Sequence, residues 1–375
     1  MRSEFGVQGT ALRPEEGLTY GGIGGGFPLA EWYTSPDAFE LERTRLFTHS
    51  WALVGTSDEV AETGSYLTAD IGGSPLLVMR GPDGVLRAFQ NLCRHRGVVL
   101  VEGRGRLDGS VVCPYHSWAY DLSGSLDRIP QSRAQFPDVD PTCWGLLPAS
   151  VGEWQGMVFA SPQPDIGTIA DRLGDLGKRL EPYLAGDHTE LAVARYTVAC
   201  NWKLIVENHI DVYHLWYLHK ETLSAFNHPA FQYEQLEMNW WSEEMLRDPS
   251  HPPKGLPWLT HEQSASIGAH LLFPNLMLVT TGNYFATYDA VPLDAGHTEL
   301  TLRVRACPGA DGEALVGQVR SFLSEDVEVC TRMQRAVASP AFSVGPLAKT
   351  HEAPMLAFHH HLRQVMGLDE ASGAG

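Results

Sequence analysis

Two short segments of this 375-residue chain each carry one cysteine and one histidine at close spacing. The first is "CRHRG", with Cys93 and His95, and the second is "CPYHSW", with Cys113 and His116. Residues 96–112 separate the pairs, which is enough for a loop and a returning strand. Zinc fingers pair cysteine with cysteine and histidine with histidine, whereas each segment here supplies one of each. The chain must therefore bring two mixed loops together around one group.

This mixed order suits a cluster of two irons, in which one iron takes both thiolates and the other takes both imidazoles. Each loop then contributes one ligand to each iron. Replacing two thiolates by neutral imidazoles raises the reduction potential, which is the signature of a Rieske [2Fe–2S] centre. A structural zinc site is the alternative for Cys93, His95, Cys113 and His116.

A second group of metal-binding residue types lies in "NWKLIVENHIDVYHLWYLHK", which holds Asp211, His214 and His219. A Rieske cluster only stores and passes electrons, so the chain should also contain an acceptor. Two histidines and a distant carboxylate form the facial triad of non-haem Fe(II) oxygenases. His219 lies about 140° around an ideal helix from His214. Both histidines can reach one metal only if the helix ends or distorts, and we expect this near Trp216.

The third ligand should come from residues 311–338, which read as one long helix. Its apolar stripe places position 326 toward the interior, while position 325 falls in the polar row. A carboxylate on a buried stripe is costly unless it is paired or binds a metal. We therefore predict that Asp326 is the ligand and that Glu325 faces away, so that Glu325→Ala has little effect. The stripe consists of Leu315, Val319, Phe322, Cys330 and Met333.

The remaining pattern predicts an α+β protein with two modules. Residues 51–159 contain short β-type runs, including a hairpin with its turn at Asp83-Gly84. Residues 268–307 give three strand-like runs in an antiparallel meander, and a long helix follows them. We expect an N-terminal arm and helix at 1–49, a small all-β module at 50–162, and a catalytic domain at 163–375. The Gly-rich start and the end of the chain are expected to be flexible.

Composition excludes several function classes. The formal net charge is −18 and no Lys/Arg cluster occurs, which argues against nucleic-acid binding. No run of eighteen apolar residues and no leader sequence is present, so we expect neither membrane insertion nor secretion. Six cysteines in 375 residues are not a disulfide framework, and a reducing cytoplasm is expected.

The chain resembles the catalytic α-subunit of Rieske non-haem iron oxygenases over nearly its whole length. The resemblance rests on "YTSPDAFELERTRLF", "LRAFQNLCRHRG", "CPYHSWAYDLSG", "VENHIDVYHLWYLH" and "SEDVEVCTRMQRA". The family commonly has glycine where Ser117 stands, a change that we expect ligation to tolerate. The resemblance implies a helix-grip catalytic domain, in which an antiparallel sheet wraps over a long C-terminal helix, and a head-to-tail homotrimer.

The same resemblance implies roles for single residues. Asp211 would bridge His214 to a Rieske histidine of the neighbouring subunit and carry the electron between them. Asn208 and Tyr213 would lie near the mononuclear iron. His209 lies off the motif spacing, and we expect it at the surface rather than at the metal.

The function implied is that of a terminal oxygenase. Electrons would come from NAD(P)H through a flavin and iron–sulfur reductase, directly or through a ferredoxin. The oxygenase would use O2 to hydroxylate or oxidatively demethylate a small organic molecule, such as an aromatic compound or an amine. Residues 220–265 would shape the substrate site. The alternatives are an electron-transfer or redox-sensing protein with an idle binding domain, and a zinc-stabilised binding protein.

Overall fold

The structure is a computed structural model that describes residues 29–186, 188–223, 231–234, 240–246, 256–307, 310–342, 347–348 and 351–368. The expected Gly-rich arm, much of the segment 220–265 and the tail from 369 lie outside these residues. The chain divides into two compact units. Residues 42–172 form the first, which we call the β unit. Residues 29–41 and the described residues from 173 onward form the second, the α+β unit.

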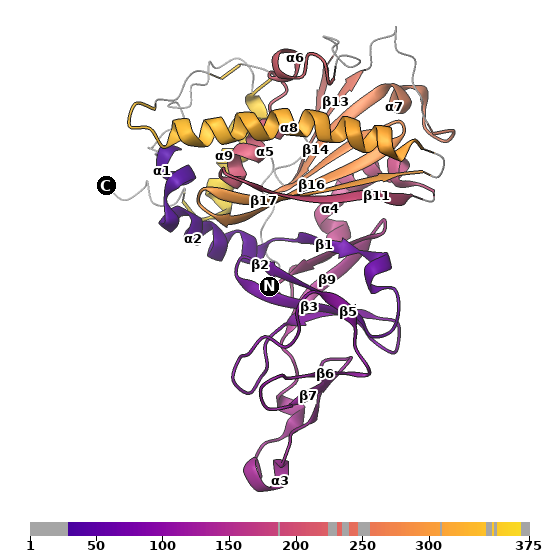
Figure 1. Cartoon of the computed structure of the whole chain (residues 1–375), viewed down its shortest axis with the longest axis vertical. Helices are drawn as coiled ribbons and strands as arrows, with labels where there is room; N and C mark the ends of the chain where they lie inside the picture. The colour runs from indigo at the N-terminus through magenta and orange to yellow at the C-terminus, as the bar shows by residue number, and fades with distance from the viewer. Residues whose placement is uncertain are drawn as a thin grey trace. The chain divides into compact units, whose positions relative to one another are not determined.

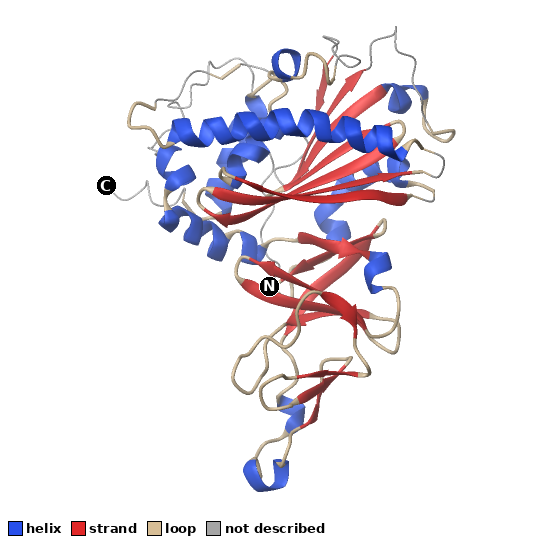
Figure 2. Cartoon of the chain, viewed as in Figure 1, coloured by secondary structure: helices blue, strands red, loops and turns tan. Residues whose placement is uncertain are grey.

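The β unit consists of two antiparallel sheets with only short helices (Figure 2). It is wider at both ends than the expected module at 50–162. The larger sheet has the order β1-β10-β9-β4-β3-β2-β5 and the smaller has the order β6-β7-β8. The strands are β1 (Ala52–Thr56), β2 (Ser65–Ile71), β3 (Ser74–Arg80), β4 (Leu86–Gln90), β5 (Arg104–Arg106), β6 (Ser110–Val112), β7 (Ala119–Asp121), β8 (Leu126–Arg128), β9 (Pro148–Trp154) and β10 (Met157–Ser161), with the short helices η1 (Phe47–His49), η2 (Ser57–Val60), α3 (Ser132–Gln135) and η3 (Pro141–Cys143).

Strand β3 separates two apolar cores because successive side chains of a strand point to opposite faces. Leu76 and Val78 belong to one core, and Leu77 and Met79 belong to the other. The second core also contains Cys93 and Cys113. The predicted hairpin is present, since β3 and β4 pair and Gly84 takes the left-handed conformation that its turn requires.

The α+β unit contains one seven-stranded antiparallel sheet with the order β11-β17-β16-β15-β14-β13-β12. The expected α+β class and the sheet over a long helix are confirmed. The first of the three strand-like runs expected over residues 268–307 is divided by residues 273–275 into two strands, β14 and β15. The strands are β11 (Thr189–Val198), β12 (Phe231–Glu234), β13 (Trp240–Leu246), β14 (Ser266–Leu272), β15 (Leu276–Thr281), β16 (Tyr284–Asp294) and β17 (His297–Ala306).

A long helix, α8 (Gly312–Val337), runs across this sheet (Figure 1). Helix α5 (Trp202–Ile210) contacts α8 and also strands β14 and β16. Four members of the predicted stripe on α8 are buried, whereas Met333 is exposed. The other helices are α1 (Leu29–Thr34), α2 (Pro36–Arg45), α4 (Ile169–Leu184), α6 (Leu215–Leu218), α7 (His261–Ala265) and α9 (Ala353–Val365).

Helix α2 corresponds to the helix expected from "SPDAFELERTRLF", and the short helix α1 precedes that segment. Ser35 separates them and caps α2, since its hydroxyl accepts from the Asp37 amide at 3.2 Å. Within the α+β unit, the backbone carbonyl of Tyr33 accepts from the Gln334 side chain at 2.9 Å. None of the described helices combines the length and the apolar character needed to cross a membrane.

Candidate metal centres and the adjoining cavity

Two turns in the β unit present the four predicted cluster ligands. In the first, the amide of Cys93 donates to Val98 and the amide of Gly97 donates back to Cys93, at 2.9 and 2.8 Å. In the second, the amide of Cys113 donates to Trp118 at 2.8 Å. This second turn closes through a non-glycine residue with a φ of 56°, Ser117.

The turns bring the four side chains together. The ring centroids of His95 and His116 are 4.7 Å apart, and the thiols of Cys93 and Cys113 interact. Burial lowers the pKa of His95 and raises that of Cys113, so the imidazole is held neutral. His95 Nδ1 is buried and has no hydrogen-bond partner among the described residues. Two thiols beside two imidazoles, one with an orphaned nitrogen, fit a Rieske cluster.

Tyr120 also contacts this site, although the sequence pattern did not predict it. Its hydroxyl accepts from the Arg94 amide at 2.9 Å and lies 3.4 Å from Cys93 Sγ. Either group can be the donor in this contact, but a cluster-bound thiolate has no proton, so the phenol would donate to the sulfur once the cluster is present. The segment "HSWAYD" could have indicated this contact, because Tyr120, on strand β7, follows closely after the predicted ligand His116.

The second candidate centre depends on a break in the helix. Helix α5 starts at its cap Asn201, whose side chain accepts from the Lys203 amide, and it ends at Ile210. Asp211 is extended, and the short helix α6 follows before His219. A break was expected, but it lies before His214 rather than near Trp216. Asp211 and His214 approach each other through this turn and not through a shared helical face.

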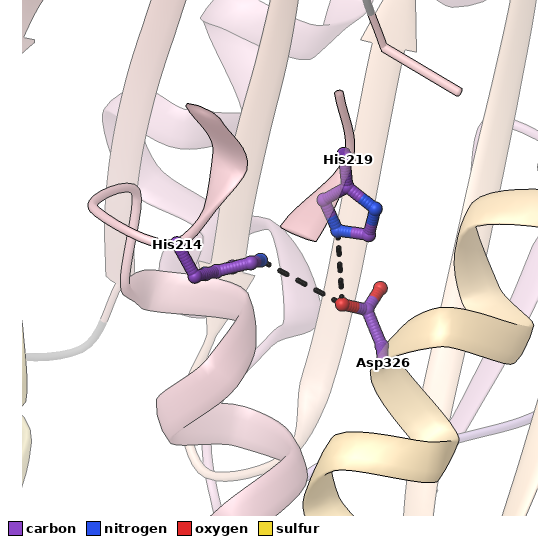
Figure 3. Close-up of side chains that lie close together, drawn as sticks. All are labelled: His214, His219 and Asp326. Carbon is purple, nitrogen blue, oxygen red and sulfur yellow. Dashed lines mark hydrogen bonds and ion pairs between the residues drawn. The ribbon is translucent and has the colours of Figure 1, made fainter. Parts of the chain in front are cut away.

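The break brings His214, His219 and Asp326 together (Figure 3). His219 Nε2 lies 3.0 Å from Asp326 Oδ1, and His214 Nε2 lies 3.6 Å from the same oxygen. Typical metal–ligand lengths of about 2.0–2.2 Å put neighbouring donor atoms roughly 3 Å apart. The three side chains therefore fit a single metal ion, with one carboxylate and two imidazoles on one side of it.

The surrounding contacts correct one prediction. Glu325 does not face away: its Oε2 accepts from His219 Nδ1 at 2.6 Å and from the Thr222 hydroxyl at 2.7 Å. Helical periodicity alone did not predict this contact, because His219 reaches Glu325 from another part of the chain. A carboxylate on one imidazole nitrogen leaves the other nitrogen facing the metal.

Two further contacts involve predicted residues. The Asn208 amide donates to Asp326 Oδ1 at 2.9 Å. Asp211 Oδ2 lies 3.3 Å from His214 Nδ1, while its Oδ1 accepts from the Tyr213 amide at 2.7 Å. The Tyr213 ring is exposed and packs on Tyr217, and it is not among the described residues that line the cavity beside the triad.

The charges of the metal-binding side chains shift one another's pKa values. Burial would lower the pKa of His214, but Asp211 and Asp326 outweigh it and raise that pKa to about 9. Burial would likewise raise the pKa of Asp326, but His214 and His219 hold it well below its usual range. Without metal, protonated His214 forms an ion pair with the Asp326 carboxylate. A metal cation would replace the proton that His214 carries.

The triad lies on the wall of a cavity of about 90 Å³ within the α+β unit. Side chains of helices α5 and α8 line the cavity, and so do side chains of strands β14, β15, β16 and β17. Tyr288 is the lining residue on β16. His209 was expected at the surface, but it lines the cavity and donates from Nε2 to the His270 carbonyl at 3.0 Å. The other strand side chains are Ile267, Ala269, Met277, Val279 and Leu300.

Comparison with known proteins gives a family match for each of the two regions that contain these residues. Residues 50–143 match the Rieske [2Fe-2S] domain family, and residues 185–368 match the catalytic domain of the ring-hydroxylating alpha subunit. Together the two matches span well over half of the chain.

Individual relatives extend this result. The chain is 27% identical to choline monooxygenase of Beta vulgaris, over 95% of this chain and 78% of that protein. It is 36% identical to the carnitine monooxygenase oxygenase subunit of Escherichia coli K12, over 49% of this chain and 50% of that protein. A solved quaternary ammonium Rieske monooxygenase has a TM-score of 0.78 and 25% identity, covering 90% of this chain and 94% of that one.

Proposed function

The chain belongs to the alpha subunits of the Rieske ring-hydroxylating oxygenases, and we propose that its His214, His219 and Asp326 hold the catalytic iron. Membership makes it a terminal oxygenase with a Rieske cluster and a non-haem iron domain. The convergence of the three side chains on one point beside the cavity carries the assignment of the ligands.

We assign the cluster to Cys93, His95, Cys113 and His116. The orphaned, buried Nδ1 of His95 supports this assignment. When bound, the cluster supplies single electrons and the iron supplies the site of O2 activation. The protein's part is to hold both groups, to orient the substrate and to exclude water.

The neighbouring side chains hold the iron ligands in place. The Asn208 amide fixes Asp326, and the Glu325 carboxylate fixes the tautomer of His219. Asp211 orients His214 through Nδ1. In a head-to-tail homotrimer, Asp211 would also bridge to the Rieske histidine of the next subunit. Asp211→Asn should then keep both metal sites and slow turnover steeply.

The proposed substrate is a small neutral molecule with a large apolar surface. The described lining of the cavity is mostly aliphatic and contains no lysine or arginine. Asp326 is its single carboxylate among the described lining residues and is committed to the metal. A cationic ammonium group usually needs an aromatic cage, and Tyr288 and Phe322 are the only two rings of that kind in the described lining.

The second candidate is oxidative demethylation of a quaternary ammonium compound, which the similarity to the choline and carnitine monooxygenases favours. The proposed system includes an NAD(P)H-dependent reductase, with or without a ferredoxin, in the cytoplasm. The experiment is therefore a reconstitution with a reductase and NADH, in which O2 uptake, formaldehyde and product are measured.

Neutral substituted benzenes are compared with choline, carnitine and glycine betaine, and Asp326→Ala serves as the inactive control. Hydroxylated or demethylated product from a neutral compound supports the proposal. Formaldehyde from an ammonium compound alone would replace it by the second candidate. Metal analysis separates both from an electron-transfer protein: about three irons per chain are expected for an oxygenase and two for a carrier.

A further inference from the structure

One polar group in the cavity lining, apart from the metal-binding triad, lacks a hydrogen-bond partner among the described residues. Tyr288 lies on β16, opposite Met277 of β15, and both side chains line the cavity. The residue is 4% exposed, and its hydroxyl has no hydrogen-bond partner among the described residues. Buried polar groups nearly always have a partner, so an orphaned hydroxyl needs an explanation.

The other polar groups of the described lining, apart from the metal-binding triad, have partners within the protein. The Asn208 amide donates to Asp326, and His209 donates to the His270 carbonyl. The Cys330 thiol donates to the Leu204 carbonyl at 3.5 Å. The Tyr288 hydroxyl is therefore the exception in this part of the lining.

The surroundings of Tyr288 determine what the hydroxyl can do. Its neighbours in the wall include Met277, Val279 and Leu300, whose side chains offer no strong acceptor. Burial, together with the negative charge of Asp326, raises the pKa of the phenol well above its usual range. The hydroxyl therefore keeps its proton and remains an unused hydrogen-bond donor on a side chain that lines the cavity.

We propose that Tyr288 is a specificity-determining residue whose hydroxyl donates a hydrogen bond to the substrate. The matching substrate is a mostly apolar molecule with one neutral acceptor, such as a carbonyl or ether oxygen. A carboxylate is disfavoured, because the described lining has no cation to compensate its burial beside Asp326. This inference rests on the proposed function and narrows its substrate class.

The test compares two probes of the same shape, acetophenone and α-methylstyrene, which differ in a carbonyl oxygen against a methylene group. Each is titrated into the iron-loaded full chain treated with nitric oxide, and the EPR signal of the iron nitrosyl reports binding without turnover. The measured quantity is the ratio of the two dissociation constants. In Tyr288→Phe, the preference for the ketone should fall about tenfold, or about 1.4 kcal/mol, while binding of the alkene is unchanged.

Thr287→Val is the matched control. Thr287 is the preceding residue on β16, and its hydroxyl is likewise buried without a partner among the described residues, but it does not line the cavity. This variant should keep the wild-type ratio. Both variants remove an unpartnered hydroxyl, so neither should lower the thermal midpoint.

Several outcomes overturn the inference. One is an unchanged ratio of dissociation constants in Tyr288→Phe, and another is an equal loss of affinity for both probes in that variant. A third is that the ketone leaves the EPR signal of the wild type unaltered while the alkene perturbs it. A large fall in the thermal midpoint of Tyr288→Phe would show that the hydroxyl has a structural partner, such as an ordered water. Absence of any nitrosyl signal in the wild type would instead reject the proposed function.

Discussion

Two adjacent carboxylates on α8 have different tasks. Asp326 faces the metal position, and Glu325 accepts from the distal nitrogen of His219. The sequence pattern assigned Asp326 to the interior and, wrongly, Glu325 to the outward face. Helical periodicity describes one helix, whereas this contact depends on where His219 arrives from another part of the chain.

Glu325 should therefore matter for metal retention. Glu325→Ala is expected to weaken iron binding by about tenfold to a hundredfold, the usual effect of removing a partner of a metal-bound histidine. Competition with a chelator measures this affinity. Glu328→Ala is the control, because Glu328 is on the same helix but exposed and paired with Arg332. Equal iron retention in the two variants would show that the Glu325 contact has no such role.

The Tyr120 hydroxyl should tune the cluster. Hydrogen bonds to cluster sulfurs raise the reduction potential because they stabilise the more negative, reduced state. Tyr120→Phe is therefore expected to lower the potential by tens of millivolts, with the cluster still bound. Voltammetry of the full chain measures it. An unchanged potential would mean that the phenol does not donate to Cys93 in the loaded protein.

At the scale of elements, the turn that carries Cys113 and His116 contains one residue in an unfavourable backbone conformation. Ser117 takes a left-handed φ of 56°, which costs a non-glycine residue about 1–2 kcal/mol. Ser117→Gly should raise the free energy of unfolding of the cluster-loaded protein by about 1 kcal/mol. Denaturant unfolding followed by cluster absorbance tests this. A less stable variant would show that the serine side chain makes a compensating contact.

Asp289, on strand β16, should make the free energy of unfolding depend on pH. Burial raises the pKa of Asp289 to about 7, even though the charge of Arg303 opposes this. The folded chain holds a proton that the unfolded chain releases near pH 4, so this stabilisation is lost as pH rises from about 4 through 7. Asp289→Asn should therefore be more stable than wild type at pH 8, by about 2–4 kcal/mol, and much less so at pH 5. A difference independent of pH would contradict this.

The sequence predicted element types better than element ends. Helix α8 and the hairpin at Gly84 were predicted because one period or turn signal dominates each. The break after Ile210 was predicted at the wrong position. Two histidines that share a metal require the helix to break, but this requirement does not fix the residue at which it breaks. Tyr288 gave no signal, since a tyrosine in a strand reads as packing until the cavity beside it is known.

For the whole molecule, mixed assemblies test the proposed route between subunits. Cys113→Ser chains should lack the cluster, and Asp326→Ala chains should lack the iron. Each alone should be inactive. If a head-to-tail ring passes electrons to the neighbour, co-assembled equal mixtures should recover about one quarter of the active sites. Transfer within one subunit predicts no recovery, and turnover per chain distinguishes the two cases.

The break after α5 also affects how this site can change in evolution. A residue inserted into α8 before Asp326 would rotate both carboxylates by about 100° and remove them from the site. A residue inserted at the extended Asp211 could be absorbed by the turn, because loops accept length changes at small cost. The number of residues between the end of α5 and Asp211 is thus freer to vary than the spacing along α8, whereas the spacing from Asp211 to His214 is constrained by the contact between them.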